Sequence, residues 1–257
     1  MDWINEFYST TGEWWGGAES ATTESDENRA KIIKRICPTS KIVLELGCGY
    51  GNTAAATASA GFDVVANELS DRIKFAKKFK NEKYIGSLKF VKGDFYTTEL
   101  GKNYDVVAYW NGFGIGTDMD QRRLLKRICD DWLADNGRAL IDIGNPFVRS
   151  SWAGEVEHKD ASPERGYHHT IDEVIDYDPV HNRFIDTWWE SKSPDKKFTQ
   201  TIRNYTPADL VLLLEGTGLK IESIFVGDEK VNVNSDYVGF AGLLKDSQEY
   251  LVVLKKI

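Results

Sequence analysis

The sequence predicts an α/β fold with a parallel sheet and crossover helices, and two observations support this. Short apolar runs rich in valine and isoleucine alternate with stretches of helical character from residue 41 onward. Residues that start or stop helices also fall between these runs. This order is typical of parallel strands joined by helices. The runs are KIVLEL from Lys41, DVVAN from Asp63, LKFVKGD from Leu88, DVVAYW from Asp105 and RALIDI from Arg138.

Boundary residues place the helices between these strands. Ser70 can cap the stretch DRIKFAKKFK, and Thr206 with Pro207 opens ADLVLLLEG with a capping residue and a first-turn proline. Gly61 and Gly137 stand where a preceding helix should stop. We therefore expect helices that end at these glycines and helices that begin after Ser70 and Thr206.

Residues 1–40 lie outside the alternation and read as two helices. The second runs roughly from Glu24 to Cys37 and is ended by Pro38. The cluster Trp14-Trp15-Gly16-Gly17 is expected to lie between the two helices. We interpret this segment as an N-terminal helical lid.

Residues 148–205 form the second exception. The stretches TIDEVIDYD, NRFIDTWWES and KFTQTIRNY read as strands joined by turn residues. We expect an antiparallel β insertion that covers an acceptor site, within a single domain of residues 1–257. The core of that domain is expected to comprise residues 41–147 and 206–257.

Composition limits the function classes. The chain has 257 residues, of which 41% are hydrophobic, so it can bury a full core in one domain. Its net charge of -8 disfavours a nucleic-acid partner. The three cysteines show no CxxC spacing, which fits a reducing compartment without disulfides or a zinc knuckle. With no signal peptide or membrane-length apolar stretch in view, we expect a soluble cytoplasmic protein without a membrane partner.

The motif that carries chemistry is VLELGCGYGNTAAA, which begins at Val43. A buried strand runs into Gly47, Gly49 and Gly51, which permit a tight turn and close approach of a ligand, and a helix with unpaired N–H groups follows. The spacing is G-x-G-x-G, whereas the dinucleotide fingerprint is G-x-G-x-x-G. Glu68 ends the next strand, where a carboxylate can accept both hydroxyls of a ribose. This arrangement predicts a site for a nucleoside-bearing cofactor.

In these residues the chain resembles the class I S-adenosylmethionine-dependent methyltransferases. The resemblance covers residues 41–145 and 206–257 and implies a Rossmann-like, seven-stranded, mostly parallel sheet with helices on both faces and a closing antiparallel strand pair. It implies S-adenosylmethionine (SAM) as cofactor. We expect cofactor contacts from residues of the glycine turn, the strand-two acid, the GDF segment, the YWNGFG segment and the lid: Glu45, Gly47, Cys48, Gly49, Gly51, Glu68, Leu69, Asp94, Phe95, Trp110, Asn111 and Tyr8.

Some of these residues also have structural interpretations. Asp94 can simply cap a turn, as aspartate often does in loops. Trp110 and Phe113 can be ordinary core aromatics, although the neighbouring glycines favour a loop. Cys48 fits better as a small space-filling residue than as a nucleophile, since no histidine lies nearby in the sequence.

The acceptor side is less well defined by the sequence. Trp14, Trp15 and Phe113 are candidates for contacts with the acceptor, and His168 in the insertion is a candidate base if the acceptor is a hydroxyl or a carbon acid. Each histidine can equally have a surface role, and the aromatic residues can be core. We expect no metal, because the paired Asp-Asn pattern of metal-dependent relatives is missing after strand five.

These observations predict a methyltransferase that methylates a nitrogen or oxygen atom of a small molecule by in-line displacement. The alternatives are a peptide or protein methyltransferase and a non-catalytic SAM-binding protein. An NAD-dependent oxidoreductase is a distant alternative, since it would need the later third glycine. We expect a monomer or homodimer.

Overall fold

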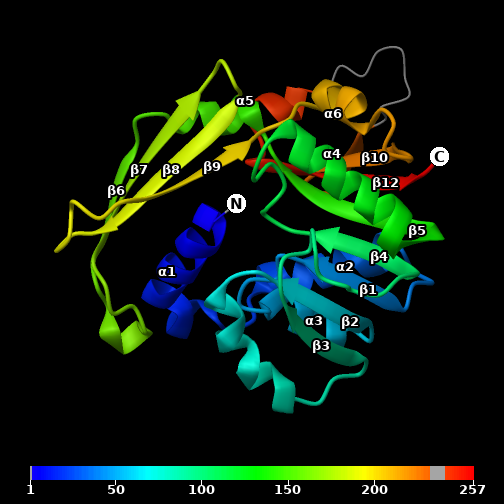
Figure 1. Ribbon diagram of the computed structural model, residues 1–257, viewed down its shortest axis with the longest axis horizontal. Helices are drawn as coiled ribbons and strands as arrows, with labels where there is room; N and C mark the ends of the chain where they lie inside the picture. Colours follow the sequence, from blue (N-terminus) through cyan, green and yellow to red (C-terminus); the bar gives the residue numbers. More distant parts are fainter. Residues whose placement is uncertain (1, 232–240) are drawn as a thin grey trace.

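In the computed structural model, which describes residues 2–231 and 241–257, the chain forms two sheets (Figure 1). The large sheet has the strand order β11-β10-β12-β5-β4-β1-β2-β3. Its strands are β1 (Ile42–Leu46), β2 (Asp63–Glu68), β3 (Ser87–Lys92), β4 (Tyr104–Tyr109), β5 (Leu133–Gly144), β10 (Leu219–Val226), β11 (Glu229–Val231) and β12 (Glu249–Lys256).

The predicted fold class is confirmed. Strands β3, β2, β1, β4 and β5 pair in parallel, and β12 and β10 close the sheet in antiparallel fashion. The seven expected strands are therefore present. The short strand β11 adds an eighth by pairing with the outer edge of β10.

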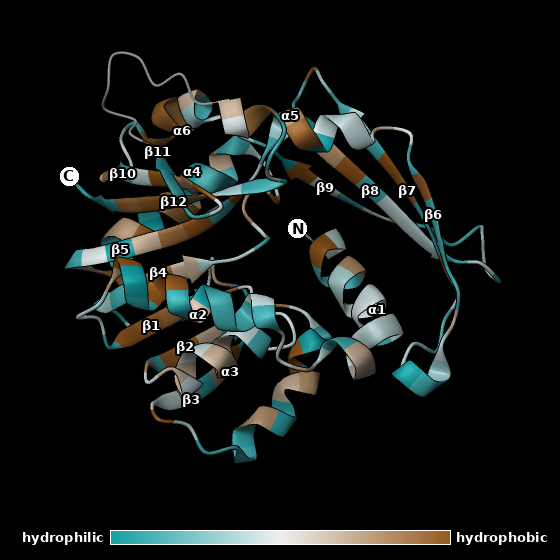
Figure 2. Cartoon of the chain, turned by 180° about the vertical axis from the view of Figure 1, so that it is seen from behind, coloured by the Kyte–Doolittle hydropathy of each residue, from teal (hydrophilic) through white to brown (hydrophobic). Residues whose placement is uncertain are grey.

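Helices cover both faces of the large sheet. They are α2 (Glu24–Ile36), α3 (Asn52–Ser59), α4 (Asp118–Arg127), the π-helical turn Ile128–Trp132 and α6 (Pro207–Leu214). One core joins α2 and α3 to the sheet through small and branched residues such as Ile33, Ala54 and Val106. The other joins α4, the π-helical turn and α6 to the opposite face, with Trp132 fully buried. The strands between these layers are predominantly hydrophobic (Figure 2), as expected for strands buried on both faces.

Several helix boundaries agree with the sequence patterns. Thr206 forms a capping box with Asp209 at the start of α6, and Ser70 caps the 3₁₀ helix Asp71–Asn81. Gly61 follows α3 closely, as predicted. The expectation for Gly137 is wrong: the helical segment before it ends at Trp132, and strand β5 begins at Leu133.

The N-terminal segment forms helix α1 (Asp2–Glu19), followed by α2. Trp14, Trp15 and Gly16 lie within α1, so the prediction that their cluster separates the helices is wrong. The glycine serves helix packing instead, because a Cβ atom on Gly16 would overlap the ring of Phe75 in the 3₁₀ helix. One turn earlier, a Cβ on Gly12 would lie 2.5 Å from Cγ of Arg72. Small residues on one side of α1 thus permit its close contact with the segment after β2.

This packing gives a first prediction. Gly16→Leu is expected to lower the free energy of unfolding by about 1–3 kcal/mol, because the new side chain overpacks the contact with Phe75. Thermal denaturation followed by tryptophan fluorescence measures this effect. The control is Glu6→Leu, on an exposed position of the same helix. Equal melting temperatures for the two variants would contradict the packing role of Gly16.

The insertion forms the second sheet, with the order β6-β7-β8-β9. Its strands are β6 (Val156–Lys159), β7 (Ile171–Asp178), β8 (Arg183–Glu190) and β9 (Phe198–Arg203), all antiparallel. Three of them correspond to the predicted stretches, and β6 is additional. Helix α1 lies between this sheet and the large sheet in both views (Figures 1 and 2). No helix in the described part of the chain is long and apolar enough to cross a membrane.

Candidate functional site

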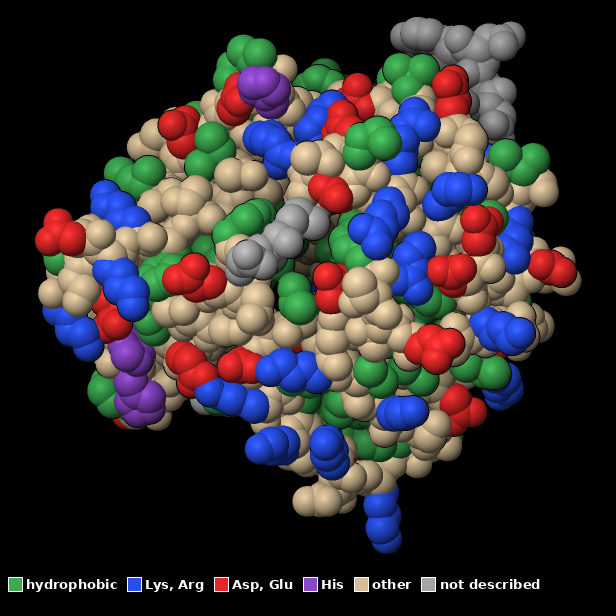
Figure 3. All heavy atoms as spheres, viewed as in Figure 1, with side chains coloured by type: hydrophobic (Ala, Val, Ile, Leu, Met, Phe, Trp, Pro, Cys, Tyr) green, Lys and Arg blue, Asp and Glu red, His purple; other side chains and the backbone are tan. Residues whose placement is uncertain are grey.

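A cavity of about 570 Å³ lies between the carboxyl ends of the parallel strands, helix α1 and the inner face of the insertion sheet. Ligands of open α/β sheets bind at this edge, where the crossover connections diverge. The residues that border the cavity come from segments as far apart as Ile4 and Glu249. Lysine and arginine side chains are interspersed with acidic ones over the face seen in Figure 3, so the surface there has no extended patch of one sign.

The glycine turn after β1 forms one wall. Gly47, Gly49 and Gly51 have positive φ angles of 60°, 55° and 84°, which glycine adopts without strain. Beyond its two chain neighbours, a Cβ on Gly49 would meet no atom of the described residues within 4 Å, and Gly49 lines the cavity. Gly51 does not line it, and a Cβ there would lie 2.6 Å from the ring of Phe90. Gly49 is therefore open to a ligand, whereas Gly51 is required for packing.

Glu68 holds this turn to the end of β2. Its Oε2 accepts a hydrogen bond from the Gly49 N–H at 2.8 Å, and its Oε1 accepts bonds from the N–H and hydroxyl of Ser70 at 2.7 and 2.6 Å. The residue is 7% exposed and lines the cavity together with Leu69. The carboxylate is thus fixed by three donors before any ligand contacts it.

A buried polar group lies below the turn. Glu45 lines the cavity, and burial raises its pKa to about 8 against the opposing charge of Arg29. Arg29 comes from α2, forms an ion pair with Asp142 at 3.3 Å and lies over the ring of Trp110. Asp26, one helical turn before Arg29, accepts a hydrogen bond from Thr53 at 2.6 Å. Helix α2 therefore brings a cation and a carboxylate to the end of β1.

The segments after β3 and β4 complete the cavity wall beside the glycine turn. Asp94 lines the cavity and also accepts the backbone N–H of Tyr96 at 2.8 Å, so it does cap a turn there. Phe95, Trp110 and Asn111 line the cavity as well. Asn111 adopts a left-handed φ of 58°, and the buried indole nitrogen of Trp110 has no hydrogen-bond partner among the described residues.

The opposite wall is formed by α1 and the insertion. The hydroxyl of Tyr8 donates to Oε1 of Gln200 at 2.7 Å, and Nε2 of Gln200 donates to Asp186 at 2.7 Å. The Tyr8 hydroxyl proton is therefore engaged in the hydrogen bond to Gln200, and burial raises the Tyr8 pKa far above its usual value. Phe184 and Trp188 flank Asp186 on the same face of β8 and line the cavity. This wall is thus mainly aromatic, and the hydrogen-bonded series Tyr8–Gln200–Asp186 runs through it.

Asp186 allows a prediction of pH dependence. Burial raises its pKa from 3.8 to about 7, so the folded state binds this proton more tightly than the unfolded chain does. Its contribution to stability is therefore full below about pH 4 and is lost as the pH rises to about 7. Asp186→Asn should remove this loss and raise the melting temperature at pH 8 by a few degrees, with a smaller change at pH 5. An equal shift at both pH values in differential scanning fluorimetry would contradict the assignment.

Five residues predicted from the sequence lie outside the cavity lining: Gly51, Trp14, Trp15, Phe113 and His168. Trp14 and Trp15 pack edge-on against Phe198 and Trp188, respectively, which joins α1 to the insertion sheet. Phe113 packs against Tyr205 in the core. His168 is exposed in the loop before β7.

The remaining predicted residues come together around one space: Tyr8, Glu45, Gly47, Cys48, Gly49, Glu68, Leu69, Asp94, Phe95, Trp110 and Asn111. Burial raises the pKa of Cys48 well above its usual value, which fits a space-filling thiol. In residues 2–231 and 241–257, no cluster of three or more histidine, cysteine or acidic side chains could hold a metal ion.

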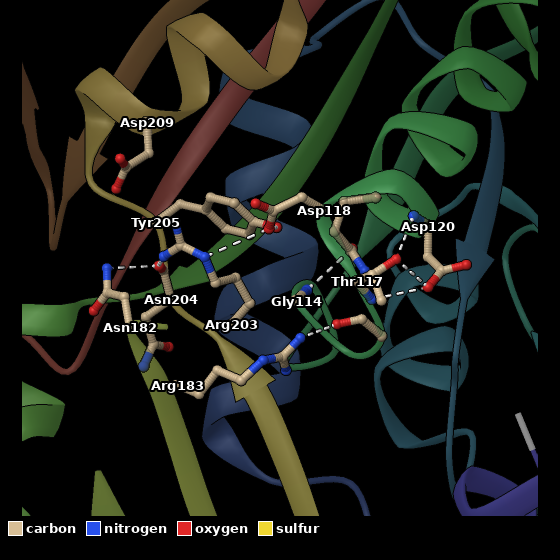
Figure 4. A network of polar contacts seen from close by, with 12 residues as sticks. Gly114, Thr117, Asp118, Asp120, Asn182, Arg183, Arg203, Asn204, Tyr205 and Asp209 are labelled. Carbon is tan, nitrogen blue, oxygen red and sulfur yellow. Dashed lines mark hydrogen bonds and ion pairs between the residues drawn. The ribbon is translucent and has the colours of Figure 1, made fainter. Parts of the chain in front are cut away.

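The loop after β4 is tied to the insertion (Figure 4). The Arg203 N–H donates to the carbonyl of Gly114, and the Arg183 guanidinium donates to the carbonyl of Gly116. Asp118 accepts the hydroxyl of Tyr205 at 2.7 Å and forms an ion pair with Arg203. The insertion therefore supports the loop that carries Trp110 and Asn111, in addition to walling the cavity.

The sequence interpretation missed several lining residues, namely Arg29, Arg72, Arg149, Phe184 and Gln200. Arg72 follows Glu68 closely and holds α1 by donating to the Tyr8 carbonyl at 3.0 Å and to the Thr11 hydroxyl at 3.0 Å. Its position soon after Glu68 in the sequence was the one feature that could have indicated a place at the cavity. The other residues come from segments that only the tertiary fold brings together.

Comparisons with known proteins agree with this geometry. A family model described as a methyltransferase domain matches residues 43–137. The CcbJ methyltransferase from Streptomyces caelestis has a TM-score of 0.74 at 18% identity, over 97% of this chain and 98% of that chain. A SAM-dependent methyltransferase from Clostridium acetobutylicum ATCC 824 has a TM-score of 0.68 at 14% identity, over 98% and 99%.

A third structure is a SAM-bound amino pentose methyltransferase from Micromonospora echinaspora, which acts in calicheamicin biosynthesis. Its TM-score is 0.55 at 17% identity, over 91% of both chains. At these identities the likeness shows a shared fold. No curated protein sequence matches the chain.

Proposed function

Because the chain is a class I SAM-dependent methyltransferase, we propose that it methylates a nitrogen or oxygen atom of a small molecule bound between α1 and the insertion. One observation carries this proposal: a single cavity borders both the glycine turn with Glu68 and the aromatic wall of Phe184 and Trp188. The similar fold of an amino pentose methyltransferase supports a small acceptor.

The residues present fit the cofactor. The open position at Gly49 is a cradle that a Cβ would fill, and Glu68 presents a fixed carboxylate for the two ribose hydroxyls. We propose that Arg29 and Glu45, which line the cavity beside the end of β1, face the carboxylate and ammonium of the methionine portion. Asp94, Phe95 and Asn111 would border the adenine and sulfonium ends. When bound, SAM supplies a methyl group already activated for displacement.

The protein's own part in the reaction is alignment and exclusion of water. Tyr8, held by Gln200, stays protonated and keeps oxygen lone pairs available to an N–H or O–H of the acceptor. Helix α1 and the insertion wall the acceptor side, which supports our assignment of residues 1–40 as a lid and 148–205 as its cover. Holding the acceptor atom in line with the methyl group can supply much of the rate acceleration of methyl transfer.

Calorimetric titration with SAM, S-adenosylhomocysteine and NAD, combined with mass spectrometry of methylated products, tests the proposal. We expect micromolar binding of the first two ligands, no binding of NAD, and methyl transfer to a nitrogen or oxygen atom of a small molecule. Binding without transfer to any acceptor would favour a non-catalytic SAM-binding protein. Transfer to peptides alone would favour a peptide or protein methyltransferase, and binding of NAD alone would favour an oxidoreductase.

A further inference from the structure

Arg149, the last residue of α5 (Pro146–Arg149), places an unpaired guanidinium at the cavity wall. Its Nε is buried without a hydrogen-bond partner, and none of the ion pairs among the described residues includes it. A buried donor that lacks a partner destabilises the fold, because it has lost its hydrogen bonds to water. An arginine of this kind in a ligand cavity can form its missing hydrogen bonds with an acceptor group of the bound ligand.

The surroundings hold this guanidinium in place. Gly144 lies directly against it, since a Cβ there would be 2.8 Å from Cζ and Nη1 of Arg149. On another side, the Phe184 ring centroid lies 5.4 Å from Cζ. Burial also lowers the Arg149 pKa, although nearby acidic groups oppose this shift. Arg149 is thus packed between backbone and an aromatic ring, with limited freedom to reach another partner.

The neighbouring charges narrow the class of ligand. Asp142 is already paired with Arg29, and Glu249 lines the same cavity without an ion pair in the described part of the chain. Both acidic groups raise the Arg149 pKa, and the negative charge they contribute disfavours a doubly charged phosphate more strongly than a singly charged ligand. A singly charged planar carboxylate matches the two-pronged donor geometry of a guanidinium.

We propose that Arg149 is a specificity-determining residue that binds a carboxylate on the acceptor, beside an apolar or aromatic portion that packs on Trp152, Phe184 and Trp188. This inference rests on the proposed function and narrows its acceptor to small carboxylic acids. Arg149 is distinct from the cofactor side in the fold, since it follows β5 and contacts β8, whereas Arg29 lies on α2 beside the glycine turn.

Fluorine NMR titrations of the full chain, saturated with S-adenosylhomocysteine, test this inference without turnover. The probes are 4-fluorobenzoate and 4-fluorobenzamide, which differ mainly in charge. We expect the wild type to bind the acid about tenfold more tightly than the amide. Arg149→Met should abolish this preference, and Arg149→Lys should keep part of it because the charge remains. The matched control Arg165→Met, on an exposed arginine of the insertion, should bind like the wild type.

Three results would overturn the inference: no binding of 4-fluorobenzoate by the wild type, equal binding of acid and amide, or an unchanged preference in Arg149→Met. A weakened affinity of Arg149→Met for S-adenosylhomocysteine would also overturn it, by placing Arg149 in the cofactor site. If Arg149→Met fails to fold, Arg149→Lys must still lose several-fold in affinity for the acid. A charge preference in a protein that transfers no methyl group would refute the proposed function and leave the carboxylate site intact.

Discussion

Glu68→Ala is expected to weaken the binding of SAM and of S-adenosylhomocysteine by about 2 kcal/mol, or roughly 30-fold. Two effects combine. The mutation removes the acceptor proposed for both ribose hydroxyls, and hydrogen bonds to a charged group are among the stronger kind. It also leaves the N–H groups of Gly49 and Ser70 without the carboxylate that now holds them. Isothermal titration calorimetry measures the loss directly.

The matched variant Glu68→Gln separates these effects. Its amide oxygen can still accept one of the backbone N–H bonds, but the charge and the second acceptor are gone. We expect an intermediate affinity and a circular dichroism spectrum like that of the wild type for both variants, because the large sheet has its own core. Unchanged affinity in folded Glu68→Ala would show that the ribose-binding acid is placed wrongly.

The grouping of residues around the glycine turn was predictable because its signals are local in the sequence. One strand, one turn and one helix contain Gly47, Gly49 and Gly51, and Glu68 ends the strand that pairs with β1. Parallel pairing brings those two strand ends to the same edge. The pattern of apolar runs similarly predicts the sheet, since each buried strand needs residues that tolerate contact on both faces.

The opposite wall of the cavity, proposed to contact the acceptor, depends on tertiary contacts that no spacing reveals. Gln200 meets Tyr8 across 192 positions of sequence, and Arg149 reaches the cavity only because α5 turns back over Gly144. The assignment of Phe113 as an acceptor contact came from neighbouring glycines, which mark a loop but not the direction of a side chain. The residue instead faces Tyr205 in the core.

The two consecutive glycines of α1 show a second limit of prediction from the sequence. Glycine lowers helix propensity by about 1 kcal/mol, so two consecutive glycines read as a break. In the fold, Gly16 lies inside α1. The close contact between α1 and Phe75 leaves no room for a side chain at this position. Helix packing thus outweighs local propensity at this position.

The second large effect is expected for Gly49→Val, which should abolish measurable binding of S-adenosylhomocysteine, a loss of more than about 100-fold. The valine side chain would project into the cavity, where no atom of the described residues other than its chain neighbours lies within 4 Å of the new Cβ, and would occupy the space proposed for the cofactor. The φ of 55° adds strain of about 1–2 kcal/mol for a residue other than glycine.

Gly51→Ala is the matched comparison, because it also adds a side chain at a positive φ but away from the cavity. Its Cβ would lie 2.6 Å from the Phe90 ring, so the variant should lose stability mainly through packing. We therefore expect Gly51→Ala to have the lower melting temperature and Gly49→Val the weaker ligand binding. Near-wild-type affinity in folded Gly49→Val would refute the assignment of this turn to the cofactor, because the added side chain would fill the space that the cofactor is proposed to occupy.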